Sequence, residues 1–223
     1  MNLKKRLERP VGRRFPLRGS HTPERGQGSK MELRTASPAD APRLSEIYAP
    51  YVQNTAISFE FEAPSAEEFG RRIAETLKKY PYLVIEEEGR ILGYAYAGPF
   101  HTRAAFSHSA EISIYVDEKE RGRGLGRLFY NEIEKILARQ NIFRAYASIA
   151  VSEKPDPYLT DGSIRFHEAM GYRKVAEHHE CGYKFGHWYS LIYVEKELHS
   201  VLERVEEFIP FPELGWQRKS IKI

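Results

Sequence analysis

The sequence predicts a mixed α/β domain with antiparallel strands in its first half and βα units in its second half. Stretches of alternating apolar residues are separated by stretches with helical spacing, in the order β-α-α-β-β-β-α-β-α-β-β. Hydrophobic residues make up 41% of the 223 residues and aromatic residues 13%, which is enough to build a packed core. We therefore expect a central sheet that is flanked by helices.

Two helices are expected between strands in the first half of the chain. Ser37 is an N-cap residue with Pro38 at the first helical position, and Ser65 opens the second helix in the same way. After the second helix the pattern becomes that of strands joined by a tight turn, which indicates a β-hairpin. The expected strands are residues 33–35, 82–85, 91–98 and 110–116.

The second half alternates between strands and helices. Residues 122–126 lead into a long amphipathic helix that ends near Asn141. A shorter helix over residues 163–170 is closed by Gly171, a residue type that is typical of helix C-termini. The expected strands are residues 144–151, 172–176 and 188–197.

Charge is unevenly placed along the chain. The net charge is +3, but residues 1–30 hold nine Lys or Arg and two Glu, so the remaining residues carry −4. We expect residues 1–30 to be a basic, disordered extension, 31–198 the folded domain, and 199–223 a C-terminal tail with a short helix. That helix is indicated by apolar residues at helical spacing, namely Val201, Leu202, Val205 and Phe208. The basic segment is open to two interpretations, an arm that binds nucleic acid or a partner, and a leader outside the fold.

Composition excludes several classes of protein. The single cysteine, Cys181, excludes an internal disulfide framework and a Cys-rich zinc site, and the eight His are scattered, so we expect no metal. No apolar run approaches the roughly 20 residues that cross a bilayer, and the first 30 residues lack the apolar region of a secretory signal. We expect a soluble, cytoplasmic protein with no membrane partner.

Three glycines stand at alternate positions between an expected strand and an expected helix. Gly122, Gly124 and Gly126 let successive backbone N–H groups turn toward one point, where the helix N-terminus adds its positive dipole end. Such a turn can hold a pyrophosphate, and Arg121 and Arg123 can add positive charge. The spacing differs from the G-x-G-x-x-G of dinucleotide folds and lacks the G-K-[ST] of a P-loop. The glycines alone fit an ordinary tight turn equally well.

The sequence R-G-R-G-L-G over residues 121–126 resembles motif A of the GNAT superfamily of N-acetyltransferases, which cradles the pyrophosphate of acetyl-CoA. Residues 163–172 resemble motif B of the same superfamily. The segments G-Y-K-F-G-H-W at 182–188 and N-T-A-I-S-F-E at 54–60 resemble its phosphinothricin and methionine sulfoximine acetyltransferase branch. The resemblance covers about residues 31–198.

The resemblance implies a GNAT fold, a mixed sheet with parallel strands that splay at the CoA site. It also implies an N-acetyltransferase that moves the acetyl group of acetyl-CoA to the primary amine of a small amino-acid-like acceptor in a ternary complex. A homodimer is expected as well, with the last strands or the C-terminal helix as its contact.

Two residues are implied as catalytic groups. Glu111 matches the position of the catalytic Glu and is our candidate general base. His167 matches a motif B position that often holds a general-acid Tyr, and a histidine can act as acid or base near neutral pH. Periodicity alone favours Glu111 as an outward strand residue, and the family match reverses this interpretation. His167 has the alternative of a packing residue on its helix face, since catalytic roles are rare.

The implied binding residues fall into two sets. The cofactor set is Ile114, Tyr115, Val116, Arg121, Gly122, Arg123, Gly124, Leu125, Gly126, Thr160 and Ser163. The substrate set is Phe100, His101, Thr102, Arg103, Lys184 and Trp188. Of these, Arg103 suits a bidentate grip on a carboxylate. Thr160 stands where the family usually has Asn, and the loop over 153–160 is longer than usual.

Other functions stay open at this stage. The acceptor of a GNAT enzyme can be a protein N-terminus, a polyamine or an aminoglycoside. A non-enzyme alternative is a nucleic-acid-binding module that uses the basic segment. Phe15 is the sole aromatic residue in residues 1–30, which disfavours stacking on bases.

Overall fold

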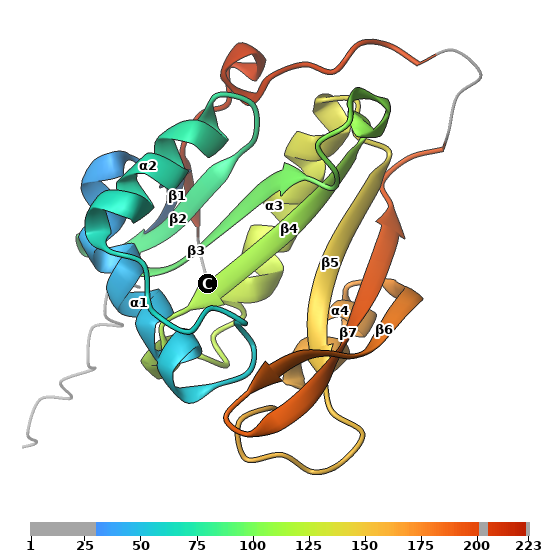
Figure 1. The fold of residues 1–223 in the computed structure, drawn as a ribbon. Helices are drawn as coiled ribbons and strands as arrows, with labels where there is room; N and C mark the ends of the chain where they lie inside the picture. The colour runs from blue at the N-terminus through green and yellow to red at the C-terminus, as the bar shows by residue number, and fades with distance from the viewer. Residues whose placement is uncertain (1–29, 201–204, 222–223) are drawn as a thin grey trace, which may run out of the picture.

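A computed structural model describes residues 30–200 and 205–221 of the chain. They form an eight-stranded mixed sheet with the strand order β6-β7-β5-β4-β3-β2-β1-β8 (Figure 1). The strands are β1 (Met31–Thr35), β2 (Tyr82–Glu87), β3 (Arg90–Pro99), β4 (Ser109–Val116), β5 (Arg144–Val151), β6 (Arg173–Lys184), β7 (His187–Glu197) and β8 (Lys219–Ile221). The helices are α1 (Ala41–Asn54), α2 (Ala66–Leu77), α3 (Leu125–Arg139) and α4 (Gly162–Ala169). This confirms the predicted fold class.

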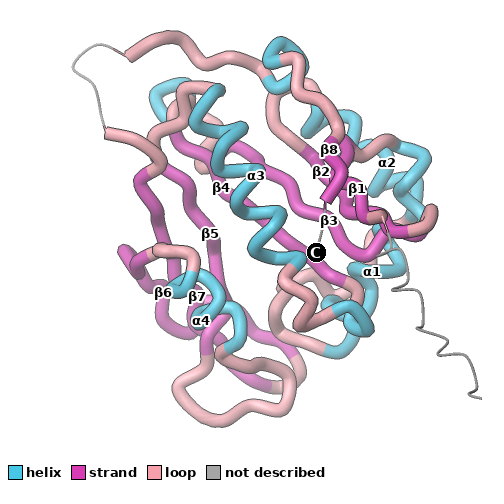
Figure 2. Tube along the Cα trace, turned by 180° about the vertical axis from the view of Figure 1, so that it is seen from behind, coloured by secondary structure: helices cyan, strands magenta, loops and turns pink. Residues whose placement is uncertain are grey.

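The helices divide between the two faces of the sheet. α1 and α2 cover β1 to β3 on one face, where Leu44, Phe69 and Ile73 pack against Val84 of the sheet. α3 and α4 lie on the other face (Figure 2), and Phe129 of α3 belongs to the core on that side. On the face that carries α1 and α2, which is turned toward the viewer in Figure 1, no helix covers β4 and β5.

The predicted helix starts are largely confirmed. Ser65 caps α2, since its hydroxyl accepts the backbone N–H of Glu68 at 3.2 Å. At the first helix, Pro38–Asp40 forms a 3-10 turn before α1 begins at Ala41. The Asp40 carboxylate accepts the backbone N–H of Ser37 at 2.7 Å, and this bond fixes the turn.

The sheet opens between β4 and β5. β4 pairs with β3 from Val116 to Ala110, but its parallel pairing with β5 runs only from Ser109–Arg144 to Glu111–Tyr146. β5 continues beside β7 as far as the pair Val151–Ser190. The two central strands therefore separate after Glu111, as the resemblance to a splayed sheet implies.

The β6–β7 hairpin is longer than the sequence predicts. β6 runs to Lys184 instead of ending at Ala176, because register shifts near Lys174–Ala176 and His178–Gly182 break the alternation of apolar residues. Its exposed residues give β6 little apolar pattern to recognise in the sequence.

The C-terminal residues belong to the sheet. β8 pairs antiparallel with β1, and Phe208, Phe211 and Trp216 pack against the core beneath α3. The expected helix is not found in the described part, since residues 205–210 are irregular and a 3-10 turn occupies Phe211–Leu214. Residues 201–204 of that prediction, and the basic extension up to residue 29, lie outside the described residues.

Phe211 tests whether this segment is part of the folded core. Phe211 is 5% exposed, so Phe211→Ala is expected to lower the free energy of unfolding by about 3–5 kcal/mol. Urea titration followed by circular dichroism measures the change. Val205→Ala, at an exposed position in the same segment, is the control and should stay within about 0.5 kcal/mol. A similarly small effect at Phe211 would contradict the assignment.

Candidate functional site

Glu111 lies where β4 and β5 separate. Its pair with Tyr146 is the last between the two strands, and its side chain is partly buried. The hydroxyl of Ser148, two residues further along β5, donates to Oε1 of Glu111 at 2.5 Å. Alternation puts Glu111 on the face of β4 opposite to Ile112, whose side chain belongs to the core beneath α3. Glu111 therefore faces the side of the sheet where the opening is not covered by α3.

The backbone of β4 offers hydrogen-bonding groups to this opening. The N–H of Asp117 donates to the carbonyl of Leu92 at 2.8 Å, so residues 117, 115 and 113 direct their amides toward β3. Ile114 directs its amide the other way, beyond the last β4–β5 pair. The amide and carbonyl of Val116 also point away from β3, but the carbonyl already accepts a hydrogen bond from the Tyr51 hydroxyl at 2.6 Å. Of the three strand residues expected to bind cofactor, Ile114 fits best, whereas the Tyr115 amide is directed to β3.

The glycine turn lies directly before α3. Gly122 and Gly124 have φ angles of +80° and +77°, which side chains rarely adopt, and a Cβ at either would meet no atom within 4 Å. The first helical bond runs from the N–H of Leu128 to the carbonyl of Gly124, at 3.2 Å. The N–H groups of residues 125–127 therefore have no acceptor within the helix. They lie at the positive end of the helix dipole, where they can donate to a bound anion. The turn fits an anion such as a pyrophosphate.

Gly126 has a packing role in the first turn of α3. A Cβ there would lie 3.0 Å from the ring of Phe166 in α4, which is tighter than ordinary van der Waals contact, so the ring would have to shift. The third glycine of the motif thus leaves room for the Phe166 ring of α4 against the first turn of α3.

The two arginines of the turn lie in different surroundings. Arg123 donates to both carboxylate oxygens of Glu87 at 3.0 Å and to Glu120 at 2.6 Å, and these hydrogen bonds raise its pKa further. Arg121 is exposed, with its guanidinium 5.2 Å from the centre of the Tyr51 ring. Arg123 is therefore held by two carboxylates, whereas Arg121 is more exposed and makes one longer ion pair, with Glu118 at 3.5 Å.

His167 is 4% exposed and has partners for both ring nitrogens. Nδ1 lies 2.7 Å from the carbonyl of Ser163, and Nε2 lies 2.6 Å from the hydroxyl of Tyr130. Since a carbonyl only accepts, Nδ1 carries the proton and Nε2 accepts from Tyr130. Burial lowers the pKa of His167, which favours this neutral form. The contacts describe a histidine that joins α4 to α3, the packing alternative of the sequence analysis.

Of the two predicted cofactor residues at the start of α4, Thr160 lines a pocket and Ser163 does not. Thr160 is exposed, and its hydroxyl accepts the Gly162 N–H only weakly, at 3.4 Å. Thr160, Ser152 and Ile164 are among the residues that line a pocket of about 280 Å³ between the end of β5 and α4. Ser163 is partly buried and contributes its carbonyl to His167.

The loop after β3 brings part of the predicted substrate set near the opening. Phe100 stacks on Tyr146 of β5, with ring centres 3.9 Å apart, and Tyr146 is the pair partner of Glu111. His101, Thr102 and Arg103 are exposed beside it. Phe100 can therefore form a wall next to Glu111, and the ring of His101 packs against it with ring centres 4.2 Å apart.

Lys184 and Trp188 do not join that wall. Lys184 is 4% exposed, and its ammonium donates to the carbonyls of Val52, Thr55 and Ser58 at 2.7, 3.0 and 2.6 Å. All three of its N–H donors are thus used inside the protein, which argues against the expected substrate contact. Trp188 is 57% exposed and packs beside Tyr183.

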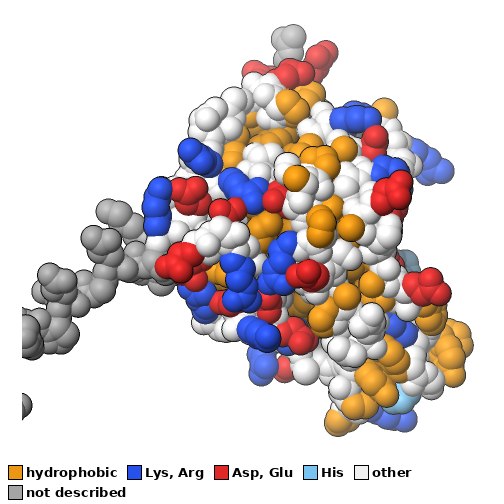
Figure 3. Space-filling model, turned by 90° about the vertical axis from the view of Figure 1, so that its left-hand side faces the viewer, with side chains coloured by type: hydrophobic (Ala, Val, Ile, Leu, Met, Phe, Trp, Pro, Cys, Tyr) orange, Lys and Arg blue, Asp and Glu red, His pale blue; other side chains and the backbone are white. Residues whose placement is uncertain are grey.

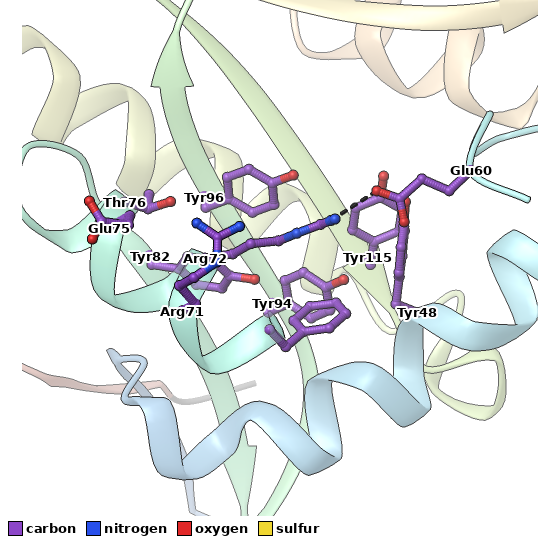
Figure 4. A pocket seen from close by; sticks show the side chains of 11 residues that line it. Tyr48, Glu60, Arg71, Arg72, Glu75, Thr76, Tyr82, Tyr94, Tyr96 and Tyr115 are labelled. Atoms are coloured by element: carbon purple, nitrogen blue, oxygen red, sulfur yellow. Dashed lines mark hydrogen bonds and ion pairs between the residues drawn. The ribbon is translucent and has the colours of Figure 1, made fainter. Parts of the chain in front are cut away.

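Sequence reasoning missed a tyrosine-lined pocket of about 290 Å³ beside β4 (Figure 4). Its residues come from α1, α2, the loop between them and three strands; those labelled in the figure are Tyr48, Glu60, Arg71, Arg72, Glu75, Thr76, Tyr82, Tyr94, Tyr96 and Tyr115. Tyrosines at alternate positions 94 and 96 of a predicted strand were the available signal.

Charged side chains of both signs are interspersed on the face shown in Figure 3, with apolar patches between them. Among residues 30–200 and 205–221, no three His, Cys, Asp or Glu side chains gather closely enough to hold a metal ion. None of the helices in these ranges is long and apolar enough to cross a membrane.

Comparison with known proteins identifies the family. The model of an acetyltransferase (GNAT) domain matches residues 33–192. The chain belongs to the GNAT superfamily of acetyltransferases. This GNAT enzyme is 30% identical over 167 residues to a phosphinothricin N-acetyltransferase of Streptomyces viridochromogenes, which covers 75% of this chain and 87% of that protein.

Further relatives lie in the same branch. A methionine sulfoximine and methionine sulfone acetyltransferase of Salmonella typhimurium is 29% identical over 75% of this chain and 95% of its own. The crystal structure of a GNAT phosphinothricin acetyltransferase from Sinorhizobium meliloti, in complex with acetyl-CoA, superposes with a TM-score of 0.70. It is 28% identical and covers 80% of this chain and 97% of its own. This GNAT protein is therefore an acyltransferase of the phosphinothricin-like branch.

Lys184 distinguishes a structural contact from a substrate contact. Lys184→Met is expected to lower the free energy of unfolding by about 2–3 kcal/mol, because it leaves three carbonyls without their donor. Chemical denaturation measures this change. Lys174→Met, which replaces an exposed lysine on the same strand, is the control with an expected change below about 0.5 kcal/mol. A raised KM for acceptor with unchanged stability would instead support the substrate role.

Proposed function

We propose that this GNAT acetyltransferase moves the acetyl group of acetyl-CoA to the primary amine of a small amino-acid-like acceptor. The acceptor is of the phosphinothricin or methionine sulfoximine type. The observation that carries the proposal is the position of Glu111 at the point where β4 and β5 separate, on the strand that leads into the glycine turn of α3. The names of the relatives support the acceptor class.

Binding of acetyl-CoA is assigned to the glycine turn and to the opening. The amides of residues 125–127 and the open backbone at Gly122 and Gly124 suit the pyrophosphate, with Arg121 adding charge. The amide of Ile114 suits a carbonyl of the pantetheine arm, because it points into the opening. When bound, acetyl-CoA supplies a thioester that an amine can attack.

Glu111 is assigned as the general base. Ser148 holds Oε1, so Oε2 is the oxygen that we assign to the acceptor amine, directly or through one water. Glu111 takes one proton from the acceptor ammonium, the resulting amine nitrogen bonds to the acetyl carbon, and the carbon–sulfur bond breaks. The nitrogen loses a second proton as it becomes an amide, and this loss balances the proton that the leaving thiolate takes up. The buried contacts of His167 do not favour it as the source of that last proton.

The acceptor carboxylate is assigned to the loop after β3. Arg103 is exposed three residues after Phe100 in this loop, and its guanidinium has the fork geometry that binds a carboxylate through two hydrogen bonds. Homodimer formation and a cytoplasmic location stay predictions. Acetylation of a protein N-terminus, a polyamine or an aminoglycoside is the alternative that an acceptor panel distinguishes.

Gly124→Val tests the acetyl-CoA site. A β-branched residue is strained at a φ of +77° and would displace the amides of the turn, so we expect at least a tenfold weaker Kd for acetyl-CoA in calorimetry. Gly89→Val is the matched control, since Gly89 has a φ of +80° in the β2–β3 turn. The control should lose similar stability and keep its affinity for acetyl-CoA. If both variants bind acetyl-CoA with the wild-type Kd, the assignment of the pyrophosphate to this turn is wrong.

Glu111→Gln tests the base. The amide keeps the size of the side chain and cannot accept the proton, so kcat should fall by about 10²–10⁴-fold at saturating acceptor. The Kd for acetyl-CoA, measured by calorimetry, is expected to stay unchanged. An unchanged kcat would exclude Glu111 as the base.

A further inference from the structure

The tyrosine-lined pocket lies further along β4 from Glu111, since Tyr115 is one of its lining residues, and it has no role in the proposed transfer step. Tyr96 stands opposite Ser113 in the β3–β4 register, and Ser113 follows Glu111 by two residues on the same face of β4. Two residues along a strand span about 7 Å. An acceptor whose amine meets Glu111 can therefore extend its side chain over Ser113 and Tyr96 into this pocket.

Glu60 leaves a hydrogen-bond acceptor unused at the pocket. Its Oε1 accepts from Nη1 of Arg72 at 2.8 Å, the contact that is drawn as a dashed line in Figure 4. Its Oε2 is buried and has no hydrogen-bond partner within the described residues. A buried carboxylate oxygen without a donor is costly, so this oxygen is set to accept a hydrogen bond from a ligand.

Arg72 supplies hydrogen-bond donors beside the Glu60 carboxylate. Its Nε donates to Glu68 and its Nη1 to Glu60, both at 2.8 Å. Within the described part of the chain Nη2 makes no hydrogen bond, so its two N–H groups are free to donate to a ligand. The pocket thus presents one carboxylate acceptor and one guanidinium donor side by side.

Charge around the pair disfavours an ionised ligand group. Three cations, Arg71, Arg72 and Lys78, are balanced by ion pairs with the three carboxylates of Glu60, Glu68 and Glu75. An anionic side-chain end would meet Oε2 of Glu60, and a cationic end would meet Arg72. A neutral group that both donates and accepts satisfies the two together.

We propose that the Glu60–Arg72 pair binds the terminal group of the acceptor side chain. The pair selects a neutral group that has both an N–H donor and an oxygen acceptor. A sulfoximine and a primary amide have this chemistry, whereas a sulfone has only acceptor oxygens and a phosphinate is anionic. The proposal rests on the proposed function, because it takes the acceptor amine to lie at Glu111.

Methionine sulfoximine and methionine sulfone form a matched pair of probes, since they differ by an N–H in place of an oxygen. Calorimetry with the full-length enzyme and CoA present gives the Kd of each compound, and a separate turnover assay gives kcat/KM. We expect the sulfoximine to bind at least about tenfold more tightly. Glu60→Gln is expected to bring this ratio close to one or to invert it, because its amide can turn a donor toward the ligand.

Glu68→Gln is the control, because it removes the other carboxylate partner of Arg72 on the exposed side of α2. It should keep the wild-type ratio. A ratio near one in the wild type, no binding of either probe, or equal losses for both probes in Glu60→Gln would overturn the inference. Selective binding without turnover would instead count against the proposed function and leave the pocket assignment standing.

Discussion

The site depends on the hydrogen bonds that β4 and β5 do not make. β4 is held by β3 along most of its length but pairs with β5 only up to Glu111–Tyr146. Unpaired strand amides are strong donors that need a partner, and the amide of Ile114 faces the opening that results. Because Glu111 stands at the last pair, the separation of the two strands places a carboxylate at the edge of the opening.

An opening in a sheet needs other contacts to hold its two sides at a fixed distance. β7 holds β5 over its whole length, and the β6–β7 hairpin is tied to the first half of the molecule through Lys184 and the loop after α1. In that loop, the ring of Phe59 lies so close to Gly182 that a Cβ there would be 2.5 Å from it. The segments that resemble the acetyltransferase branch, 54–60 and 182–188, are thus the two sides of one contact.

The sequence predicted the elements with clear periodicity and missed those that depend on tertiary contacts. The strand over 144–151 and the cap at Ser65 were confirmed, because alternation and capping are local properties. β8 was missed because its three residues become a strand only by pairing with β1. In the site, the glycine motif located the turn before α3, where Gly122 and Gly124 have positive φ angles. The bonds of Lys184 to three carbonyls and of Arg123 to Glu87 join residues far apart in the chain, which no local pattern reveals.

The central claim is that the opening beyond Glu111 receives the acyl donor while Glu111 faces the acceptor. A crystal structure with acetyl-CoA and a non-reactive acceptor analogue tests it most directly. The account predicts the pyrophosphate on the amides of residues 125–127, a pantetheine carbonyl about 3 Å from the Ile114 nitrogen, and the acceptor nitrogen in hydrogen-bond or one-water reach of Oε2 of Glu111. Cofactor bound outside the β4–β5 opening, or an acceptor nitrogen remote from Glu111, would contradict it.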